Sequence, residues 1–328
     1  MMRLLASFLA LAIAGCGGGG ASTVPTTTAV SAATIQPGYV ADTASPSSTP
    51  YTCPSAETSS GALNCTKLPL GDHKYSTTAA KAGYIYSCES LSGSPVVSSA
   101  PWIDATTETW SLPAKVAVEG AVSWAGTFAQ KISGTTDTLS SEEVPISPHS
   151  TGTFPIAKTD PAYAYDHNPN SIERHTTSVA LSANPAVAAK PSCLGMGAIG
   201  MTLTGVAIYN GFDAAGYDAV AREEQDACHG HPDQSDTYHY HGVLQACVPD
   251  AGSATANSSL LGYALDGFGI YGPWYGGKIL TTADLDVCHG TTSAVMWNGK
   301  LVSMYHYVST YDFPYTLGCY KGTPVKTL

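Results

Sequence analysis

The chain has 328 residues, enough for one large or two modest domains with a well-buried core. Charged residues make up only 12%, about half of the share usual in soluble domains, and 33 Gly, 21 Pro and 19 Tyr argue against coiled coils and helical bundles. The formal net charge of -11 argues against a nucleic-acid-binding protein, because such proteins neutralise phosphates with Lys and Arg. Cations are the better-matched partners.

The N-terminus has the pattern of a bacterial export signal. An apolar run at residues 4–14 follows Arg3 and is too short to cross a bilayer, which takes about 20 helical residues. This predicts a signal peptide at residues 1–15. The run ends in Ile-Ala-Gly before Cys16, which resembles a lipobox, in which cleavage before the cysteine leaves it lipidated. The alternative is an ordinary signal peptide cut nearby.

A Gly-, Ser-, Thr- and Pro-rich segment follows the cysteine. Residues 17–50 read as a disordered tether that begins at the lipidated Cys16 and has a reach of roughly 30 Å. Gly17 after the cysteine, rather than Asp, resembles outer-membrane sorting. We therefore expect an exported protein that a lipid anchor holds to the cell envelope, at the outer membrane where two membranes are present.

From Tyr51 onward, short apolar or aromatic runs alternate with Gly, Pro, Ser and Asp, which predicts strands and turns. Typical runs are residues 83–86, 115–118 and 301–307. Residues 214–226 are the best helical candidate, and residues 283–287 fit a single turn. No second Pro-rich linker interrupts the chain, so we expect one all-β, sandwich-like domain with a few short helices over residues 51–328.

An internal repeat is the most informative pattern in the chain. Three motifs recur in the same order, and in each copy a cysteine follows them as a fourth match. Residues 205–210 match 267–272, residues 226–230 match 286–290, and residues 238–240 match 305–307. The cysteines are Cys247 in the first copy and Cys319 in the second. Four ordered matches are not explained by composition alone. We interpret them as two related β units, at about residues 200–250 and 260–322.

The cysteines predict a disulfide-stabilised fold. Apart from Cys16 there are eight, with no Cys-x-x-Cys pair, and an exported protein meets oxidising conditions. The order within the repeat suggests Cys228 with Cys247 and Cys288 with Cys319, each worth roughly 3 kcal/mol if unstrained. The remaining cysteines, Cys53, Cys65, Cys88 and Cys193, would form the other two bridges.

Four histidines in thirteen residues form two pairs, His229 with His231 and His239 with His241. Residues i and i+2 of a strand share a face, and the intervening residues 232–237 favour a turn, so the two strands can form a hairpin. If His231 lies opposite His239, all four imidazoles gather on one face and the tyrosines take the other; a slip of one residue would destroy the cluster. We predict the first register.

Such a cluster suits a bound cation or a shared proton network, because four protonated imidazoles would repel one another. His289 and His306 of the second copy, counterparts of His229 and His239, join the candidate set. His231 and His241 have no counterpart, which makes them the better candidates for chemistry specific to one half. In the alternative, these histidines are structural and bond to backbone or tyrosine groups.

Several carboxylates lie near the histidines in sequence. The set comprises Glu223, Glu224, Asp226, Asp233, Asp236, Asp266 and Asp286. Such groups can orient metal-bound imidazoles, and we single out Asp226 and Asp286, which precede Cys-His-Gly in both copies. Asp266 is either a cleft acid or a turn residue, and the Gly-rich segment around it favours the turn.

The motifs together resemble the YHYH-domain family. They are the YHYH of residues 238–241, with residues 228–232, 262–268, 285–290, 305–307 and 313–319. The match is strong over residues 198–322 and looser back to residue 65, through residues 68–72, 83–88, 148–155 and 168–170. The resemblance implies an exported protein of no established activity. It also points to His149 as a site residue, although the chain lacks the Asp that often precedes this histidine in the family.

Two functions compete at this point. The first is a metal-binding envelope protein, or a metalloenzyme of unknown reaction, whose imidazole-rich site takes copper or zinc. The second is a surface-binding or structural module for a glycan or protein partner, in which aromatics such as Tyr271, Trp274 and Tyr275 supply the contact surface and the histidines are structural. A hydrolase that works without metal lacks a convincing nucleophile.

Overall fold

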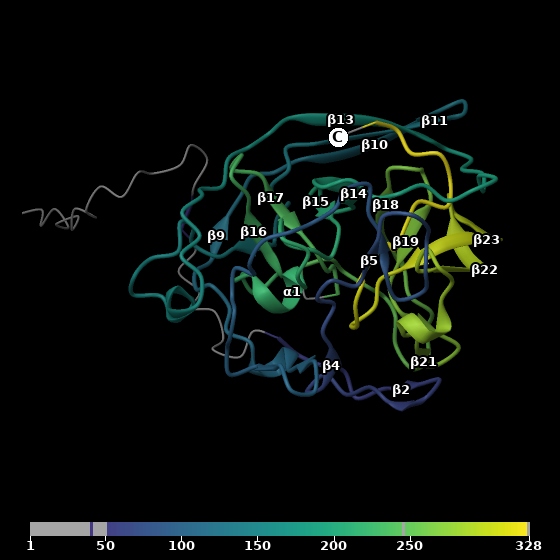
Figure 1. The fold of residues 1–328 in the computed structure, drawn as a ribbon. Coiled ribbons are helices and arrows are strands. Elements are labelled where there is room, and N and C mark those ends of the chain that lie inside the picture. Colours follow the sequence, from purple (N-terminus) through teal and green to yellow (C-terminus); the bar gives the residue numbers. More distant parts are fainter. Residues whose placement is uncertain (1–39, 42–50, 245–246, 327–328) are drawn as a thin grey trace, which may run out of the picture. The chain divides into compact units, whose positions relative to one another are not determined.

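Eight strands of the C-terminal half form the largest sheet, in the order β16-β17-β15-β14-β18-β19-β23-β22 (Figure 1). The strands are β14 (Ala198–Thr202), β15 (Ala207–Tyr209), β16 (Gly230–Pro232), β17 (Tyr238–Tyr240), β18 (Leu260–Ala264), β19 (Gly269–Tyr271), β22 (Gly290–Trp297) and β23 (Lys300–Val308). The structure is a computed structural model and describes residues 40–41, 51–244 and 247–326. The predicted signal peptide, Cys16 and nearly all of the tether lie outside these residues.

Both halves of this sheet are paired in the same way. β14 and β18 pair antiparallel at the centre of the sheet. On its other side, β14 pairs antiparallel with β15, and β18 pairs antiparallel with β19, each with one register shift. Ile208 then pairs in parallel with Tyr240, as Ile270 pairs with Tyr307. An antiparallel edge strand completes each half. The two halves of the sheet thus share one pairing scheme, while the internal repeat of the sequence stays a prediction.

A second sheet covers part of the first, as in a sandwich (Figure 1). It contains β10 (Phe128–Ser133), β11 (Thr136–Ser141) and β13 (Thr177–Ser182), in that order. Along β11, buried and half-buried residues alternate, as expected of a strand with one face in the core. Ser141 bonds to the Gly205 carbonyl and Gln130 to the Tyr263 hydroxyl, which ties this sheet to the larger one. The predicted all-β, sandwich-like class is therefore confirmed.

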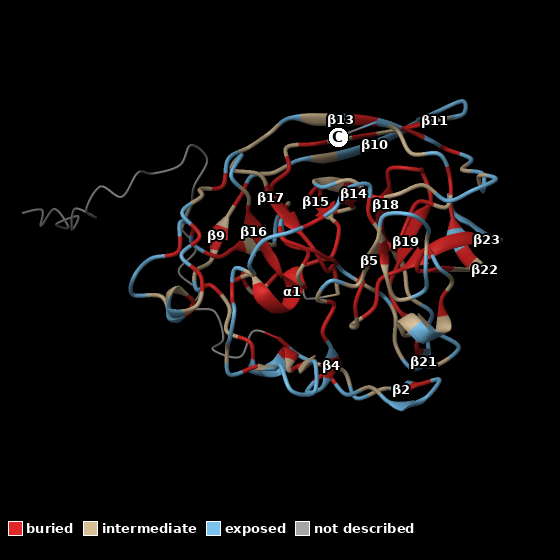
Figure 2. Ribbon diagram, viewed as in Figure 1, coloured by how far each residue is buried: buried red, intermediate tan, exposed pale blue. Residues whose placement is uncertain are grey.

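The other described strands are two residues long and form small sheets around the main one. They are β1 (Val40–Ala41) and β12 (Ser150–Thr151) on either side of β9 (Val122–Ser123); β2 (Glu57–Thr58) with β3 (Gly61–Ala62); β4 (Leu68–Pro69) and β7 (Ile103–Asp104) on either side of β8 (Thr109–Trp110); β5 (Tyr75–Ser76) with β6 (Ile85–Tyr86); and β20 (Trp274–Tyr275) with β21 (Lys278–Ile279). Burial is concentrated in the large sheet (Figure 2).

Helices are few and short, as predicted. They are α1 (Ala219–Arg222) and the 3-10 turns η1 (Leu112–Ala114), η2 (Pro161–Ala164) and η3 (Thr282–Asp284). Of the candidate helix at 214–226 only α1 forms, because the Asp218 side chain caps its start and Glu223 already has extended backbone. None of the helices in the described part of the chain is long or apolar enough to span a bilayer.

The apolar runs predicted as strands differ in outcome. Residues 301–307 lie within β23, as expected, and the run at residues 83–86 ends in β6. Residues 115–118 do not form a strand: Lys115 caps η1, and only Val118 makes an isolated bridge, to Asp226. The Lys115 side chain is buried, and its ammonium donates to the backbone carbonyls of Val220 and Glu223.

All eight cysteines of the described residues are bridged. The pairs are Cys53–Cys65, Cys88–Cys193, Cys228–Cys247 and Cys288–Cys319. The two bridges suggested by the repeat are confirmed. Because every one of these thiols is used, none is left to bind a metal.

Candidate metal centre

The hairpin of β16 and β17 brings the motif histidines together. His231 lies opposite His239, which is the predicted register. Asp233 stabilises the turn between the two strands, since its side chain accepts hydrogen bonds from the backbone N–H groups of Ser235 and Thr237. The sequence therefore places one imidazole from each strand on a shared face.

His241 completes a cluster of three. It follows the end of β17 by one residue, and its Nε2 lies 3.2 Å from the Nε2 of His239 and 3.2 Å from that of His231. The three ligand atoms all lie within 4.8 Å of one another. All three side chains are buried. This is a group that could hold a metal ion.

Hydrogen bonds at Nδ1, on the far side of each ring from the cluster, fix the tautomers of His239 and His241. His239 directs Nδ1 at the Thr237 carbonyl at 3.0 Å, and His241 directs Nδ1 at the Asn210 carbonyl. A carbonyl only accepts, so each Nδ1 carries the proton and each neutral ring presents an Nε2 lone pair. Two lone pairs that face each other at 3.2 Å cannot form a hydrogen bond. They require a shared cation or an added proton between them.

The spacing of these nitrogens fits a metal ion. Two imidazole nitrogens that each lie about 2.0–2.1 Å from zinc, at a tetrahedral angle, are about 3.3 Å apart. The two separations that involve His241 are both 3.2 Å, and all three ligand atoms lie within 4.8 Å of one another. Backbone carbonyls that hold Nδ1–H are also the usual means of orienting a metal-bound histidine.

Glu223 adds a carboxylate to the three imidazoles. Its Oε2 lies 3.2 Å from Nε2 of His241 and 3.4 Å from Nε2 of His231. No hydrogen bond satisfies this buried oxygen in the described part of the chain. Glu223 follows α1, and the buried Lys115 ammonium donates to its backbone carbonyl at 2.6 Å. That bond fixes the backbone from which the carboxylate reaches the cluster.

Burial favours the neutral forms of His231 and His239. Desolvation, and next the charges of His239 and His241, hold the pKa of His231 well below its usual value. Desolvation, and next His241, lower the pKa of His239 in the same direction. The Tyr209 ring also stacks on His239, with 3.8 Å between ring centroids. Neutral imidazoles are the form that binds metal.

His229 does not join the cluster, which corrects the predicted face of four imidazoles. Its φ is 60°, so the backbone turns out of the extended conformation one residue before β16. Its N–H bonds to the Asp226 carbonyl within this turn, and its ring packs edge-on against Tyr51. The period of two that places i and i+2 on one face ends at this residue.

The other candidate histidines lie apart from the three. His289 is buried and its Nε2 lies 3.0 Å from the Thr310 hydroxyl. His306 directs Nδ1 at the Met304 carbonyl at 3.2 Å. His149 is half-buried, and desolvation lowers its pKa. In the described residues none of them joins the group of three that could hold a metal ion.

The two singled-out carboxylates, Asp226 and Asp286, and also Asp266 accept hydrogen bonds from tyrosines and backbone N–H groups. Asp226, Asp286 and Asp266 accept from the hydroxyls of Tyr238, Tyr305 and Tyr307, respectively. Asp266 also accepts the Phe268 N–H in a turn at Gly267, whose φ is 88°. These bonds brace the fold, whereas backbone carbonyls orient the imidazoles of His239 and His241.

Glu223 is the functional candidate that sequence reasoning did not isolate. It is one of seven carboxylates near the motif, and it stands eight residues before His231 on a different element. Only the path of the chain after α1 carries it to the cluster. No spacing rule could have marked it.

Comparison with known protein families matches residues 178–280, about a third of the chain, to the family described as YHYH protein. The matched segment contains Glu223 and all three clustered histidines. No curated protein and no solved structure matches the chain. The segment that builds this histidine cluster thus matches the family described as YHYH protein.

Proposed function

We propose that the chain is a metal-binding protein of the cell envelope. One divalent transition-metal ion is bound by His231, His239 and His241, with Glu223 as the fourth ligand. The observation that carries the proposal is the pair of Nε2 lone pairs that face each other 3.2 Å apart in a buried site. A cation between them removes the repulsion and also pairs the otherwise unsatisfied Oε2 of Glu223.

Copper and zinc are the ions that best suit this set of ligands. Imidazole binds both well, and no thiolate is on hand because the described cysteines are bridged. Copper is favoured by intrinsic affinity, and zinc by a closed, four-coordinate site built only from protein groups. Four protein ligands leave no open position for substrate, so binding rather than catalysis is the function that the geometry supports.

Export and lipid anchoring form part of the proposal. They are supported by the leader that ends at Cys16 and by four disulfides, which persist in oxidising compartments. Radiolabelled palmitate incorporation in a bacterial host tests the anchor. Label is expected in the wild type and none in Cys16→Ser; equal labelling of both would contradict the anchor.

Metal content tests the binding site. The mature protein, purified after exposure to copper or zinc and then desalted, should carry one ion per chain by elemental analysis. The double variant His231→Ala/His241→Ala should carry none, and the control His167→Ala, which changes an exposed histidine, should retain one. Absence of a stoichiometric ion from the wild type would contradict the proposal. A proton shared between the histidines would then account for their closely spaced Nε2 atoms.

A further inference from the structure

The second half of the large sheet has a pocket where the first half has the histidine cluster. His306 pairs with Thr291 across β22 and β23, as His239 pairs with His231 across β16 and β17. Val308 stands two residues after His306, where His241 stands two residues after His239. Two of the three imidazole positions therefore carry other side chains, and the second half cannot form the same metal site.

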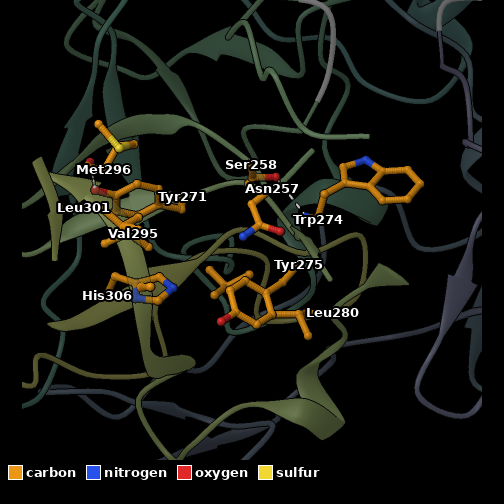
Figure 3. Close-up of a pocket in the computed structure, with 13 residues that line it drawn as sticks. Asn257, Ser258, Tyr271, Trp274, Tyr275, Leu280, Val295, Met296, Leu301 and His306 are labelled. Atoms are coloured by element: carbon orange, nitrogen blue, oxygen red, sulfur yellow. Dashed lines mark hydrogen bonds between the residues drawn. The ribbon is translucent and has the colours of Figure 1, made fainter. Parts of the chain in front are cut away.

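This pocket has a volume of about 110 Å³ and combines aromatic rings with polar groups. Tyr271, Tyr275 and His306 lie around the space near Asn257, whereas the indole of Trp274 points away from it (Figure 3). None of the residues that line the pocket is Asp, Glu, Lys or Arg. The hairpin of β20 and β21 presents Tyr275, 40% exposed, through a turn at Gly276 and Gly277, both with positive φ.

Two polar groups at this pocket are available to a ligand. His306 donates Nδ1–H to the Met304 carbonyl, so its Nε2 is left as an acceptor. Burial lowers the pKa of this imidazole, which keeps it neutral. Asn257 uses its carbonyl oxygen to accept the Gly276 N–H, so its amide N–H groups are left to donate. A purely apolar ligand would leave both groups without a partner.

A second pocket adjoins the first at Trp274. It has a volume of about 310 Å³ and is lined by Trp274, Tyr311 and Pro249 among others. Trp274 thus lines both pockets. Trp274 is therefore the residue shared by the two pockets, with its indole directed away from the smaller one, and each pocket has at least one tyrosine in its wall.

We propose that the two pockets form a binding site for an uncharged glycan of two or more sugar units, with Trp274 between two subsites. A pyranose ring has an apolar C–H face for the tyrosine and indole rings and hydroxyls that both donate and accept. Asn257 and His306 complement those hydroxyls in the smaller pocket. The absence of basic side chains there, together with a net charge of -11, disfavours an acidic sugar.

The test is an array of neutral and acidic oligosaccharides probed with the full mature protein. Neutral glycans should bind, and for the strongest of them the variants Asn257→Ala and Tyr275→Ala should each lower the affinity by about tenfold or more, measured by calorimetry. Tyr84→Ala, which removes a tyrosine far from both pockets in the sequence, serves as the control and should bind like the wild type.

The proposal stands independently of the metal centre. The double variant His231→Ala/His241→Ala should keep its glycan affinity, and Asn257→Ala should keep its metal content. Failure of every neutral glycan to bind, or full affinity in both pocket variants, would overturn the proposal. Binding confined to acidic glycans would overturn it as well.

Discussion

His239 and His241 hold their Nε2 atoms 3.2 Å apart while each points Nδ1 at a backbone carbonyl, that of Thr237 or Asn210. The two rings are thus prevented from turning away from each other. Rotation of either ring would break a buried hydrogen bond, which costs about 1–3 kcal/mol. The cation proposed above would therefore meet two imidazoles that are already oriented toward it.

Metal binding should stabilise the folded chain, because the ligands converge only in the folded state. At a free metal concentration of about 100 times Kd, the free energy of unfolding should rise by about 2.7 kcal/mol. Thermal denaturation with zinc or copper, against the same protein in chelator, checks this. The double variant His231→Ala/His241→Ala should show no such increase; an equal increase in both proteins would place the ion elsewhere.

Glu223→Gln should weaken metal binding while the fold remains intact. The amide keeps the shape of the side chain but removes the negative charge that lies 3.2 Å from His241 and 3.4 Å from His231. We expect Kd to rise by about 10- to 100-fold, measured by competition with a chromophoric chelator. Glu142→Gln, at a half-exposed ion pair with Arg174, is the control. Equal affinity of Glu223→Gln and this control would remove Glu223 from the ligand set.

The sequence predicted the hairpin because the residues that form it are close together in the chain. Two i, i+2 histidine pairs on either side of a turn-forming segment specify one face and one register, and His231 does lie opposite His239. The repeat likewise predicted Cys228–Cys247 and Cys288–Cys319. In each case the residues that interact are close in the chain or related by a copied pattern.

What could not be predicted depends on departures from regular backbone and on distant contacts. His229 has a φ of 60°, so a rule that assumes extended chain fails one residue before the strand. Glu223 reaches the cluster from the end of α1, where Lys115, more than a hundred residues earlier, holds its carbonyl. Neither a period of two nor a motif spacing contains that information.

Acid should destabilise the protein partly through His289. Burial lowers the pKa of this imidazole from the ordinary 6.5 to about 3. Between these values the unfolded chain binds a proton that the folded chain does not, so stability is lost as pH falls through this window, by up to about 5 kcal/mol in all.

The variant His289→Asn tests this contribution, because Asn tolerates the positive φ of 67° at this position. Unfolding free energies from urea titrations between pH 7 and pH 4.5, in chelator, should fall less steeply with acid in the variant than in the wild type. Parallel curves would show that His289 is not the source of the acid sensitivity.

A single methyl group at Gly230 should disturb the hairpin that carries His231. A Cβ at this position would overlap the Tyr238 ring and its hydroxyl, which bonds to Asp226. We expect Gly230→Ala to lower the free energy of unfolding by about 1–3 kcal/mol and to weaken metal binding, since β16 must shift to relieve the overlap. Gly195→Ala is the matched control: its Cβ would meet open space, and its φ lies outside the left-handed region. If urea titrations showed the same stability for both variants, close packing between Gly230 and Tyr238 would not be what holds His231 in register.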